Sequence, residues 1–287
     1  MSNGQNIFKT HLDKMRLISS FGGMKLGIIG CGKMGAALIQ GILAGRDDVS
    51  VMIKGGNQEK VARILSAYGS RVSTVTSVSA LVAECDTVII GVKPADVSQV
   101  LSECTEWSNT LLLSVAAGVK CSSLSAATLE QARIVRVMPN TPALIGAGAS
   151  AYCLGPLATE ADAQTAEVLL SSVGTVSRVK ESLMDAVTGV SGSGPAYVYM
   201  MIEALSDAGV KQGLPRETAL ELAVQTLKGA ALMVEQTGEH PAVLKEQVTS
   251  PGGTTITGVA TLESYGLRNA LIEAVEAATE KSKELGA

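Results

Sequence analysis

The stretch Lys25-Leu26-Gly27-Ile28-Ile29-Gly30-Cys31-Gly32-Lys33-Met34-Gly35 decides the fold that we predict for this chain. It begins as an apolar run, breaks into closely spaced glycines, and resumes as an apolar helical pattern through Ile42. This order predicts a strand, a glycine turn and a helix. Gly30, Gly32 and Gly35 match the pattern G-x-G-x-x-G, in which the first glycine makes the tight turn, the second lets backbone approach a pyrophosphate, and the third lets helix and strand pack closely.

The start of the predicted helix is where the phosphates of a dinucleotide would lie. Unpaired N–H groups and the positive end of the helix dipole point outward there. Lys33 and Met34 begin the helix and are candidate coenzyme contacts together with the glycines. A purely structural glycine turn is the alternative, but the strand before the glycines and the helix after them are the context that a dinucleotide site requires.

Composition limits the classes of function open to the 287 residues. Hydrophobic residues make up 46% of the chain, which is enough for the core of one large domain or two medium ones. The formal net charge of −4 gives no electrostatic reason to expect nucleic acid or a membrane surface as a partner. No apolar run approaches the ~18 residues of a membrane span. We therefore expect a soluble protein that holds a small anionic ligand by local groups.

The cysteines and the N-terminus bear on the cellular compartment. The five cysteines are scattered, odd in number and without C-x-x-C spacing, which argues against a disulfide framework and against a zinc site. We expect reduced thiols, no bound metal and a cytoplasmic protein. Residues 1–23 lack the apolar core of a secretory signal. They are predicted to be a disordered extension outside the fold, with Met24 as a candidate natural start.

Apolar runs alternate with helical patterns from residue 24 to about residue 182. These runs are too apolar for strands that expose one face, so they predict buried parallel strands flanked by helices. The expected fold class is α/β, with an N-terminal Rossmann-type doubly wound sheet over residues 24–182 that binds the dinucleotide. The strands after the first are expected near residues 49–53, 71–73, 87–92, 110–115, 134–138, 152–153 and 173–179.

Small residues and turn formers follow three of these strands. Ligands of an open α/β sheet bind outside the carboxyl ends of its strands, where small residues let a coenzyme lie against backbone. Lys93 is equally compatible with a surface lysine, and Asn140 with a turn former. The candidate coenzyme contacts at these junctions are Val92, Lys93, Pro94, Ala116, Ala117, Gly118 and Asn140.

The segment after the second strand bears on coenzyme preference. Sites selective for NAD usually place an Asp or Glu about 20 residues beyond the glycines, where it binds the ribose 2′-hydroxyl. This chain has Lys54-Gly55-Gly56-Asn57 at that point and no acidic residue before Glu59. The pattern favours NADP, with NAD as the alternative, and Lys54 is also compatible with a solvated loop lysine.

Helical spacing replaces the strand signals from Leu183 onward. Val198, Met201, Ile202 and Leu205 form an apolar i, i+3, i+4, i+7 stripe. About a hundred residues of helix with little aromatic content can hardly form a self-sufficient globule, so part of their apolar surface is expected to pack on a second subunit. We predict an all-α C-terminal domain over residues 183–287 and a homo-oligomer built from dimers through its helices.

A hydroxyl-rich turn lies between two of the C-terminal helices. Pro251-Gly252-Gly253 forces a turn, and the apolar helical stripe that follows places Thr254 and Thr255 at a helix start. N–H groups at that start, flanked by the hydroxyls of Ser250, Thr254 and Thr255, would bind a carboxylate without a basic side chain. An N-cap preceded by a loop is the alternative, but four hydroxyls and two glycines in residues 247–255 are more than a cap needs.

Six motifs in this order give the chain a resemblance to pyrroline-5-carboxylate reductase. The Ser-Pro-Gly-Gly-Thr-Thr and Gly-Ser-Gly-Pro-Ala-Tyr motifs are specific to that family, whereas the glycine fingerprint is not. The resemblance runs from about residue 24 to the C-terminus. The motifs are Gly30-Cys31-Gly32-Lys33-Met34-Gly35, Val92-Lys93-Pro94, Ala116-Ala117-Gly118, Met138-Pro139-Asn140-Thr141-Pro142, Gly192-Ser193-Gly194-Pro195-Ala196-Tyr197 and Ser250-Pro251-Gly252-Gly253-Thr254-Thr255.

The resemblance implies the NAD(P)H-dependent reduction of the cyclic imine 1-pyrroline-5-carboxylate to L-proline, the last step of proline biosynthesis. It also implies a Rossmann domain and a helical domain that interlocks with a partner subunit. Carried over by position, Thr255 would be the catalytic residue that faces the ring nitrogen of the substrate. The substrate-binding residues would be Val248, Ser250, Gly253, Thr254 and Thr255, with backbone around Ser250, Gly253 and Thr254 holding the carboxylate.

The scarcity of histidine agrees with this chemistry. Reduction of a ketone needs a well placed proton donor, commonly His or Lys, and His11 and His240 are the two histidines of the chain. A cyclic imine takes its proton from solvent or from a hydroxyl, so holding it against the nicotinamide can supply much of the rate.

Two alternatives stay open from the sequence. A reductase of the β-hydroxyacid dehydrogenase type would need a catalytic lysine on the interdomain helix, and Leu183–Gly209 contains none. A non-enzymatic NADP-binding sensor would explain the glycines but would leave the loop at Pro251 without a role.

Overall fold

The computed structural model describes residues 23–286, which form two compact units. The first comprises the described residues up to Ser193 together with the chain from Glu276 onward, and we call it the sheet unit. The second comprises Gly194–Val275, and we call it the helical unit. The disorder expected for residues 1–23 concerns residues that lie, apart from Gly23, outside the described part of the chain. The domain boundary expected after residue 182 stays a prediction.

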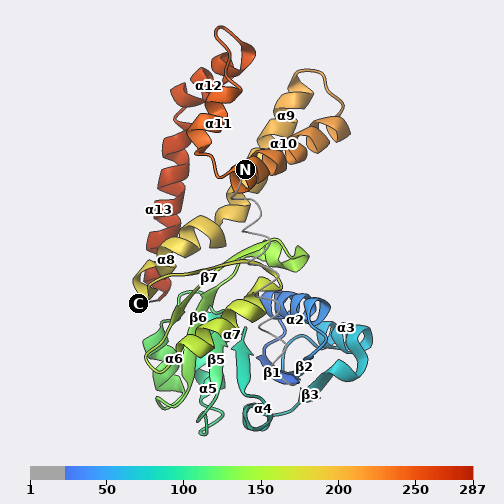
Figure 1. The fold of residues 1–287 in the computed structure, drawn as a ribbon, viewed down its shortest axis with the longest axis vertical. Helices are drawn as coiled ribbons and strands as arrows, with labels where there is room; N and C mark the ends of the chain where they lie inside the picture. The colour runs from blue at the N-terminus through green and yellow to red at the C-terminus, as the bar shows by residue number, and fades with distance from the viewer. Residues whose placement is uncertain (1–22, 287) are drawn as a thin grey trace. The chain divides into compact units, whose positions relative to one another are not determined.

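An eight-stranded sheet forms the centre of the sheet unit (Figure 1), and its strand order is β3-β2-β1-β4-β5-β6-β7-β8. Neighbouring strands run parallel except for the pair β6 and β7. The expected α/β fold with a doubly wound sheet is confirmed. The strands are β1 (Met24–Ile29), β2 (Val49–Lys54), β3 (Val72–Val75), β4 (Thr87–Ile90), β5 (Leu111–Ser114), β6 (Arg133–Met138), β7 (Gly148–Leu154) and β8 (Gly174–Arg178).

The antiparallel pair follows from the length of its connection. Residues 139–147 join β6 to β7 and contain only a 3₁₀ segment, η4 (Thr141–Ile145). A parallel crossover needs about a dozen or more residues, usually a helix, so this shorter link returns the chain in the opposite direction. The register places Val137 opposite Tyr152.

Helices cover both faces of the sheet (Figure 1). The strands bury side chains on each face. Consecutive residues of one strand enter different cores: Ile28 packs with α2 and α7 in one cluster, and Ile29 packs with α4 and α6 in the other. This burial on both faces explains the uninterrupted apolar runs. The helices are α2 (Lys33–Gly45), α3 (Gln58–Tyr68), α4 (Val78–Glu84), α5 (Val97–Leu101), α6 (Cys121–Ala127), α7 (Glu160–Ser171) and α8 (Met184–Val187).

Local capping fixes where several of these helices begin. The Thr159 side chain accepts a hydrogen bond from the Asp162 N–H, and the Asp162 carboxylate accepts one from the Thr159 N–H, which is a complete capping box at the start of α7. Asn57 Oδ1 accepts a hydrogen bond from the Lys60 N–H at the start of α3. Ser77 caps α4 in the same way.

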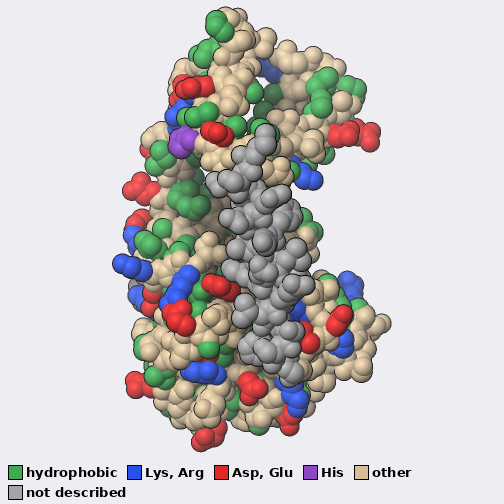
Figure 2. Space-filling model, in the orientation of Figure 1, with side chains coloured by type: hydrophobic (Ala, Val, Ile, Leu, Met, Phe, Trp, Pro, Cys, Tyr) green, Lys and Arg blue, Asp and Glu red, His purple; other side chains and the backbone are tan. Residues whose placement is uncertain are grey.

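The helical unit consists of α9 (Gly194–Lys211), α10 (Arg216–Thr237), α11 (Pro241–Gln247), α12 (Thr254–Ser264) and the first part of α13 (Leu267–Leu285). α9 and α10 approach closely where Gly209 faces Ala219, since a Cβ at Gly209 would lie 3.0 Å from the Ala219 Cβ. The predicted apolar stripe of α9 is not a buried core in this chain: Val198 is 42% exposed and Leu205 is 48% exposed. Apolar side chains lie at the surface of this unit on the face shown in Figure 2.

Candidate coenzyme and substrate sites

The glycine turn between β1 and α2 has the backbone geometry that the fingerprint predicts. Gly30 has φ +90°, a conformation that side chains rarely adopt. A Cβ at Gly35 would lie 2.4 Å from the Gly30 carbonyl oxygen, so α2 and the turn are in direct backbone contact at that point. Gly32 is the N-cap of α2, and no side chain caps the helix there. The first N–H groups of α2 therefore have no side-chain acceptor and can bind an anion.

The predicted coenzyme residues of the neighbouring strands lie along the same edge of the sheet. The Gly91 N–H donates to the Ile29 carbonyl at 2.8 Å, and the Val115 N–H donates to the Ile90 carbonyl at 3.1 Å. The ends of β1, β4 and β5 are thus side by side, which brings the segments 91–94 and 116–118 next to the glycine turn. Lys93 is exposed, and Gly118 is buried with φ +79°.

Asn140 has both ends of its side-chain amide bound to backbone. Its Nδ2 donates to the Ser191 carbonyl at 3.1 Å, and its Oδ1 accepts a hydrogen bond from the Ala149 N–H at 2.9 Å. The residue is 8% exposed. Asn140 therefore connects the start of β7 to the segment before α9. Its role in coenzyme binding stays a prediction.

Lys54, the last residue of β2, does not fit the alternative of a solvated loop lysine. Lys54 Nζ lies 2.8 Å from Glu103 Oε2, and the Lys54 side chain is 18% exposed. Gly56 has φ +104°, and a Cβ there would lie 2.4 Å from the Cys31 backbone nitrogen. Only glycine fits where this segment crosses the glycine turn. Burial raises the pKa of the Cys31 thiol, so Cys31 is a protonated packing residue beneath the turn at neutral pH.

The hydroxyl-rich turn of the helical unit leads directly into α12. The Gly253 N–H donates to the Ser250 carbonyl at 3.1 Å, and Gly252 has φ +66°. Gly253 is the N-cap of α12, and no side chain caps this helix. A Cβ at Gly253 would lie 2.3 Å from Ser250 Oγ, so a larger residue there would displace the Ser250 hydroxyl. The open N-terminus of α12 is a second place where backbone N–H groups can bind an anion.

The threonines of this turn divide into two groups by their hydrogen bonds. Thr249 Oγ1 donates to the Lys245 carbonyl at 3.0 Å, and Thr257 Oγ1 donates to the Gly253 carbonyl at 3.1 Å. Within residues 23–286, the hydroxyls of Ser250, Thr254 and Thr255 have no hydrogen-bond partner. These three hydroxyls are among the groups predicted to bind the substrate. Val248, also predicted to line the site, is 65% exposed.

The motif Gly192-Ser193-Gly194-Pro195-Ala196-Tyr197 joins the two units. A π-helical segment, η6 (Thr188–Gly192), precedes it, and the Ser193 N–H donates to the Thr188 carbonyl at 2.8 Å. A Cβ at Gly192 would lie 2.5 Å from Met138 Cε, so this glycine packs at the end of β6. The Tyr197 hydroxyl donates to the Ala274 carbonyl at 3.3 Å and ties α9 to α13 within the helical unit.

A buried ionic network was not predicted from the sequence. Arg136 on β6 is 4% exposed, and its Nη1 lies 3.4 Å from Glu181 Oε1 in η5 (Glu181–Leu183). Arg136 Nη2 lies 3.9 Å from Asp185, which accepts a hydrogen bond from Ser282 at 2.7 Å. The network connects the last part of α13 to α8 and β6 within the sheet unit. A basic residue inside the apolar run 133–138 was the available signal, because a buried charge requires a partner.

No helix in the described part of the chain combines the length and apolar character needed to cross a membrane. Within the same residues, one group of side chains offers three metal-type ligand atoms close together, namely Cys121, Cys153 and Glu181. None of these three was a candidate site residue.

Comparison with known proteins identifies the family. Residues 181–285 match the family model described as pyrroline-5-carboxylate reductase dimerisation, and residues 25–118 match the model described as NADP oxidoreductase, coenzyme F420-dependent. The chain is 48% identical over 266 residues to pyrroline-5-carboxylate reductase of Methanosarcina acetivorans, covering 91% of this chain and 98% of that protein. It is 45% identical over 265 residues to the Arabidopsis thaliana enzyme of the same name, covering 91% and 95%.

Solved structures agree with these relatives. The crystal structure of Plasmodium falciparum pyrroline carboxylate reductase with NADP bound matches with a TM-score of 0.83 and 35% identity, covering 93% of this chain and all of that chain. A pyrroline-5-carboxylate reductase from Coxiella burnetii matches with a TM-score of 0.85 and 32% identity, covering 92% and 99%. The chain belongs to the pyrroline-5-carboxylate reductase family of oxidoreductases.

Proposed function

We propose that this chain reduces 1-pyrroline-5-carboxylate to L-proline with a reduced nicotinamide coenzyme, the last step of proline biosynthesis. The observation that carries the proposal is the 48% identity to the Methanosarcina acetivorans reductase over 91% of the chain. The two uncapped helix N-termini, at Gly32 and at Gly253, support it because the reaction needs one site for a phosphate-bearing coenzyme and one for a carboxylate.

NADP is the coenzyme that we propose, with NAD as the alternative. No acidic residue lies between β2 and Glu59, and the Plasmodium falciparum relative was crystallised with NADP. The backbone of the glycine turn and of the neighbouring strand ends would hold the coenzyme. The residues proposed to contact it are Gly30, Gly32, Lys33, Met34, Gly35, Val92, Lys93, Pro94, Ala116, Ala117, Gly118 and Asn140.

The substrate would bind at the turn before α12. N–H groups at Gly253 and Thr254, together with the Ser250 hydroxyl, hold the carboxylate, and Val248 lines the same site. The Thr255 hydroxyl donates a hydrogen bond to the ring nitrogen and orients the C=N bond. When bound, the reduced coenzyme supplies the hydride to the C=N carbon. The contribution of the protein is mainly to hold the imine in reactive geometry, which can provide a large part of the rate.

The quaternary structure that we propose is a homo-oligomer built from dimers through the C-terminal helices. The family model that matches residues 181–285 is a dimerisation model. Large apolar side chains of the helical unit are exposed in the single chain, including Met200 at 68% and Ile272 at 63%. Burying such side chains against a second copy removes apolar surface from water.

We place the enzyme in the cytoplasm. The five cysteines are free thiols in the described structure, which fits a reducing compartment.

The decisive experiment follows the absorbance of the reduced coenzyme with purified full-length protein. Oxidation of NADPH is expected with 1-pyrroline-5-carboxylate and not with a panel of 2-keto acids, and NADH is expected to give a lower kcat/KM. Turnover of a keto acid with no turnover of the imine would reject the proposal. Tight NADPH binding without turnover of any substrate would instead support a coenzyme-binding sensor.

A further inference from the structure

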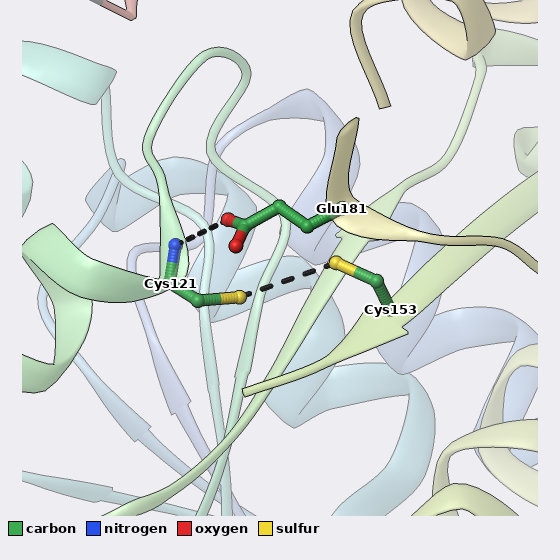
Figure 3. Close-up of side chains that lie close together, drawn as sticks. All are labelled: Cys121, Cys153 and Glu181. Carbon is green, nitrogen blue, oxygen red and sulfur yellow. Dashed lines mark hydrogen bonds between the residues drawn. The ribbon is translucent and has the colours of Figure 1, made fainter. Parts of the chain in front are cut away.

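Three side chains that the proposed reaction does not use converge inside the sheet unit (Figure 3). Cys121 is the first residue of α6, Cys153 lies on β7, and Glu181 begins η5. The two Sγ atoms are 4.0 Å apart, and the sulfur and carboxylate ligand atoms all lie within 4.8 Å of one another. Both cysteines are 2% exposed.

Charged groups around the pair favour one thiolate over two. The contact between the two thiols, in which either sulfur can donate, lowers the pKa of Cys153, and the Arg136 guanidinium acts in the same direction. The same contact raises the pKa of Cys121, with burial as the second cause. A second negative charge would lie 4.0 Å from the first, beside the Glu181 carboxylate. One nucleophilic thiolate next to one thiol is the arrangement from which a disulfide forms.

A bound metal fits the cluster less well. A structural zinc site uses four ligands with every thiol deprotonated, and this cluster offers three ligands. The Glu181 carboxylate is already engaged, because Oε1 accepts a hydrogen bond from the Cys121 N–H at 2.6 Å and lies 3.4 Å from Arg136 Nη1. The guanidinium would also repel a cation at this position.

We propose that Cys121 and Cys153 are a redox modification site, at which a peroxide converts the two thiols into a disulfide that joins α6 to β7. The Glu181 side chain is 38% exposed, and we expect a peroxide to approach the thiols from its side. A disulfide would require the sulfurs to approach from 4.0 Å to about 2.05 Å.

The reaction balances as two thiols plus one peroxide giving one disulfide and two waters. The Cys153 thiolate attacks a peroxide oxygen, the O–O bond breaks, and the released hydroxide takes back the proton that the thiol had lost. The product at Cys153 is a sulfenic acid. The Cys121 sulfur then attacks the Cys153 sulfur, the S–S bond forms, and the hydroxyl leaves with the Cys121 proton as water. The two sulfurs lose two electrons together, and the peroxide gains them. A dithiol reductant reverses the change.

Oxidation is expected to weaken coenzyme binding, and this consequence rests on the proposed function. Cys121 follows the segment Ala116-Ala117-Gly118, which we propose to contact the coenzyme, by only a few residues. We expect a covalent link between the start of α6 and β7 to alter the position of that segment.

The test uses the full-length protein treated with hydrogen peroxide, alkylated and digested with trypsin. The sequence places Cys121 in the peptide 121–133 and Cys153 in the peptide 137–178, each with one cysteine. The expected result is a linked pair of these peptides, two hydrogens lighter than their sum, with loss of two of the five free thiols and full recovery after dithiothreitol. Alkylation of Cys121 and Cys153 as free thiols, or a disulfide between other cysteines, would overturn the proposal.

Two variants and one metal probe sharpen the result. Cys153→Ser should lose the linked peptide, whereas Cys85→Ser, a change at another buried cysteine, should retain it. Peroxide should raise the Kd for NADPH in the wild type and leave it unchanged in Cys153→Ser. An equal rise in the Kd of both proteins would show that the disulfide does not weaken coenzyme binding. Protection of both thiols by Zn²⁺, with the ion retained in the native mass, would assign the cluster to a metal instead. Reduced protein that shows no reductase activity would reject the proposed function and leave the disulfide result standing.

Discussion

Thr255 and Thr257 are threonines of one helix whose hydroxyls have different surroundings. Thr257 Oγ1 donates to the Gly253 carbonyl, whereas the Thr255 hydroxyl has no partner within residues 23–286. Replacement of Thr255 by valine keeps the shape of the side chain and removes the donor proposed for the imine nitrogen. A hydrogen bond to a charged or developing charged group contributes about 1.5–3 kcal/mol, so kcat should fall roughly ten- to hundredfold.

The control for this prediction is Thr257→Val. It removes a hydroxyl two residues further along the same helix, and its kcat should stay close to that of the wild type. Steady-state kinetics with NADPH should show an unchanged KM for the coenzyme in both variants. Equal losses of kcat in the two variants would mean that Thr255 acts through the helix and not through the substrate.

Two adjacent glycines after β2 provide a second test at the residue scale. Gly55 and Gly56 both have positive φ, at +69° and +104°. A Cβ at Gly55 meets no atom within 4 Å, whereas a Cβ at Gly56 would lie 2.4 Å from the Cys31 backbone nitrogen. Gly55→Ala should cost about 1–2 kcal/mol of stability from backbone strain alone. Gly56→Ala should cost more and should also weaken NADPH binding, because it displaces the glycine turn.

Isothermal titration calorimetry with NADPH and chemical denaturation separate these two effects. The prediction for Gly56 is wrong if both variants bind NADPH with the affinity of the wild type.

At the scale of an element, α7 shows how a helix start is fixed by its cap. Thr159 and Asp162 form the reciprocal capping box, and Asp162 also pairs with Arg133 at 2.9 Å while being 2% exposed. Thr159→Ala removes one half of the box and should lower the free energy of unfolding by about 1 kcal/mol. Thr165→Ala is the matched control. The Thr165 hydroxyl donates to the Ala161 carbonyl within the same helix, after its first turn.

Urea denaturation followed by circular dichroism measures both variants. We expect Thr165→Ala to change stability by no more than about 0.5 kcal/mol, as is usual for surface substitutions. If Thr165→Ala lowers the free energy of unfolding as much as Thr159→Ala does, the cap does not set the stability of α7.

At the scale of the whole molecule, the helical unit exposes apolar side chains that a partner subunit is proposed to cover. Met200 on α9 and Ile272 on α13 are 68% and 63% exposed. Met200→Glu and Ile272→Glu place a charge on these helices and should shift the protein toward smaller species, because burying an unpaired charge is costly. The control is Ile145→Glu, at a residue 82% exposed in η4 of the sheet unit.

Size-exclusion chromatography with light scattering at micromolar concentration reports the outcome. The wild type and Ile145→Glu should form oligomers of the same size, with a mass larger than that of one chain. A wild-type mass equal to that of one chain would contradict the proposed oligomer.

Much of the sheet unit could be predicted from local pattern. The strand, glycine turn and helix at Lys25–Ile42 follow from apolar periodicity and from three glycines, and the structure shows the close backbone contacts that those glycines permit. Runs such as Thr87–Ile90 are apolar on both faces, which is enough to predict a sheet covered by helices on each side. The hydroxyls of the Ser250–Thr255 turn could likewise be predicted as a group, because they are neighbours in sequence.

Contacts between distant residues could not be predicted in this way. Lys54 pairs with Glu103, and Cys121 meets Cys153 and Glu181, across separations that carry no periodic signal. Sequence alone determined the glycine turn, the class of fold and the position of the hydroxyl-rich turn, since these depend on residues within one or two turns of each other. Only the tertiary structure decided which buried charges and thiols meet, because strand order and helix docking set those distances.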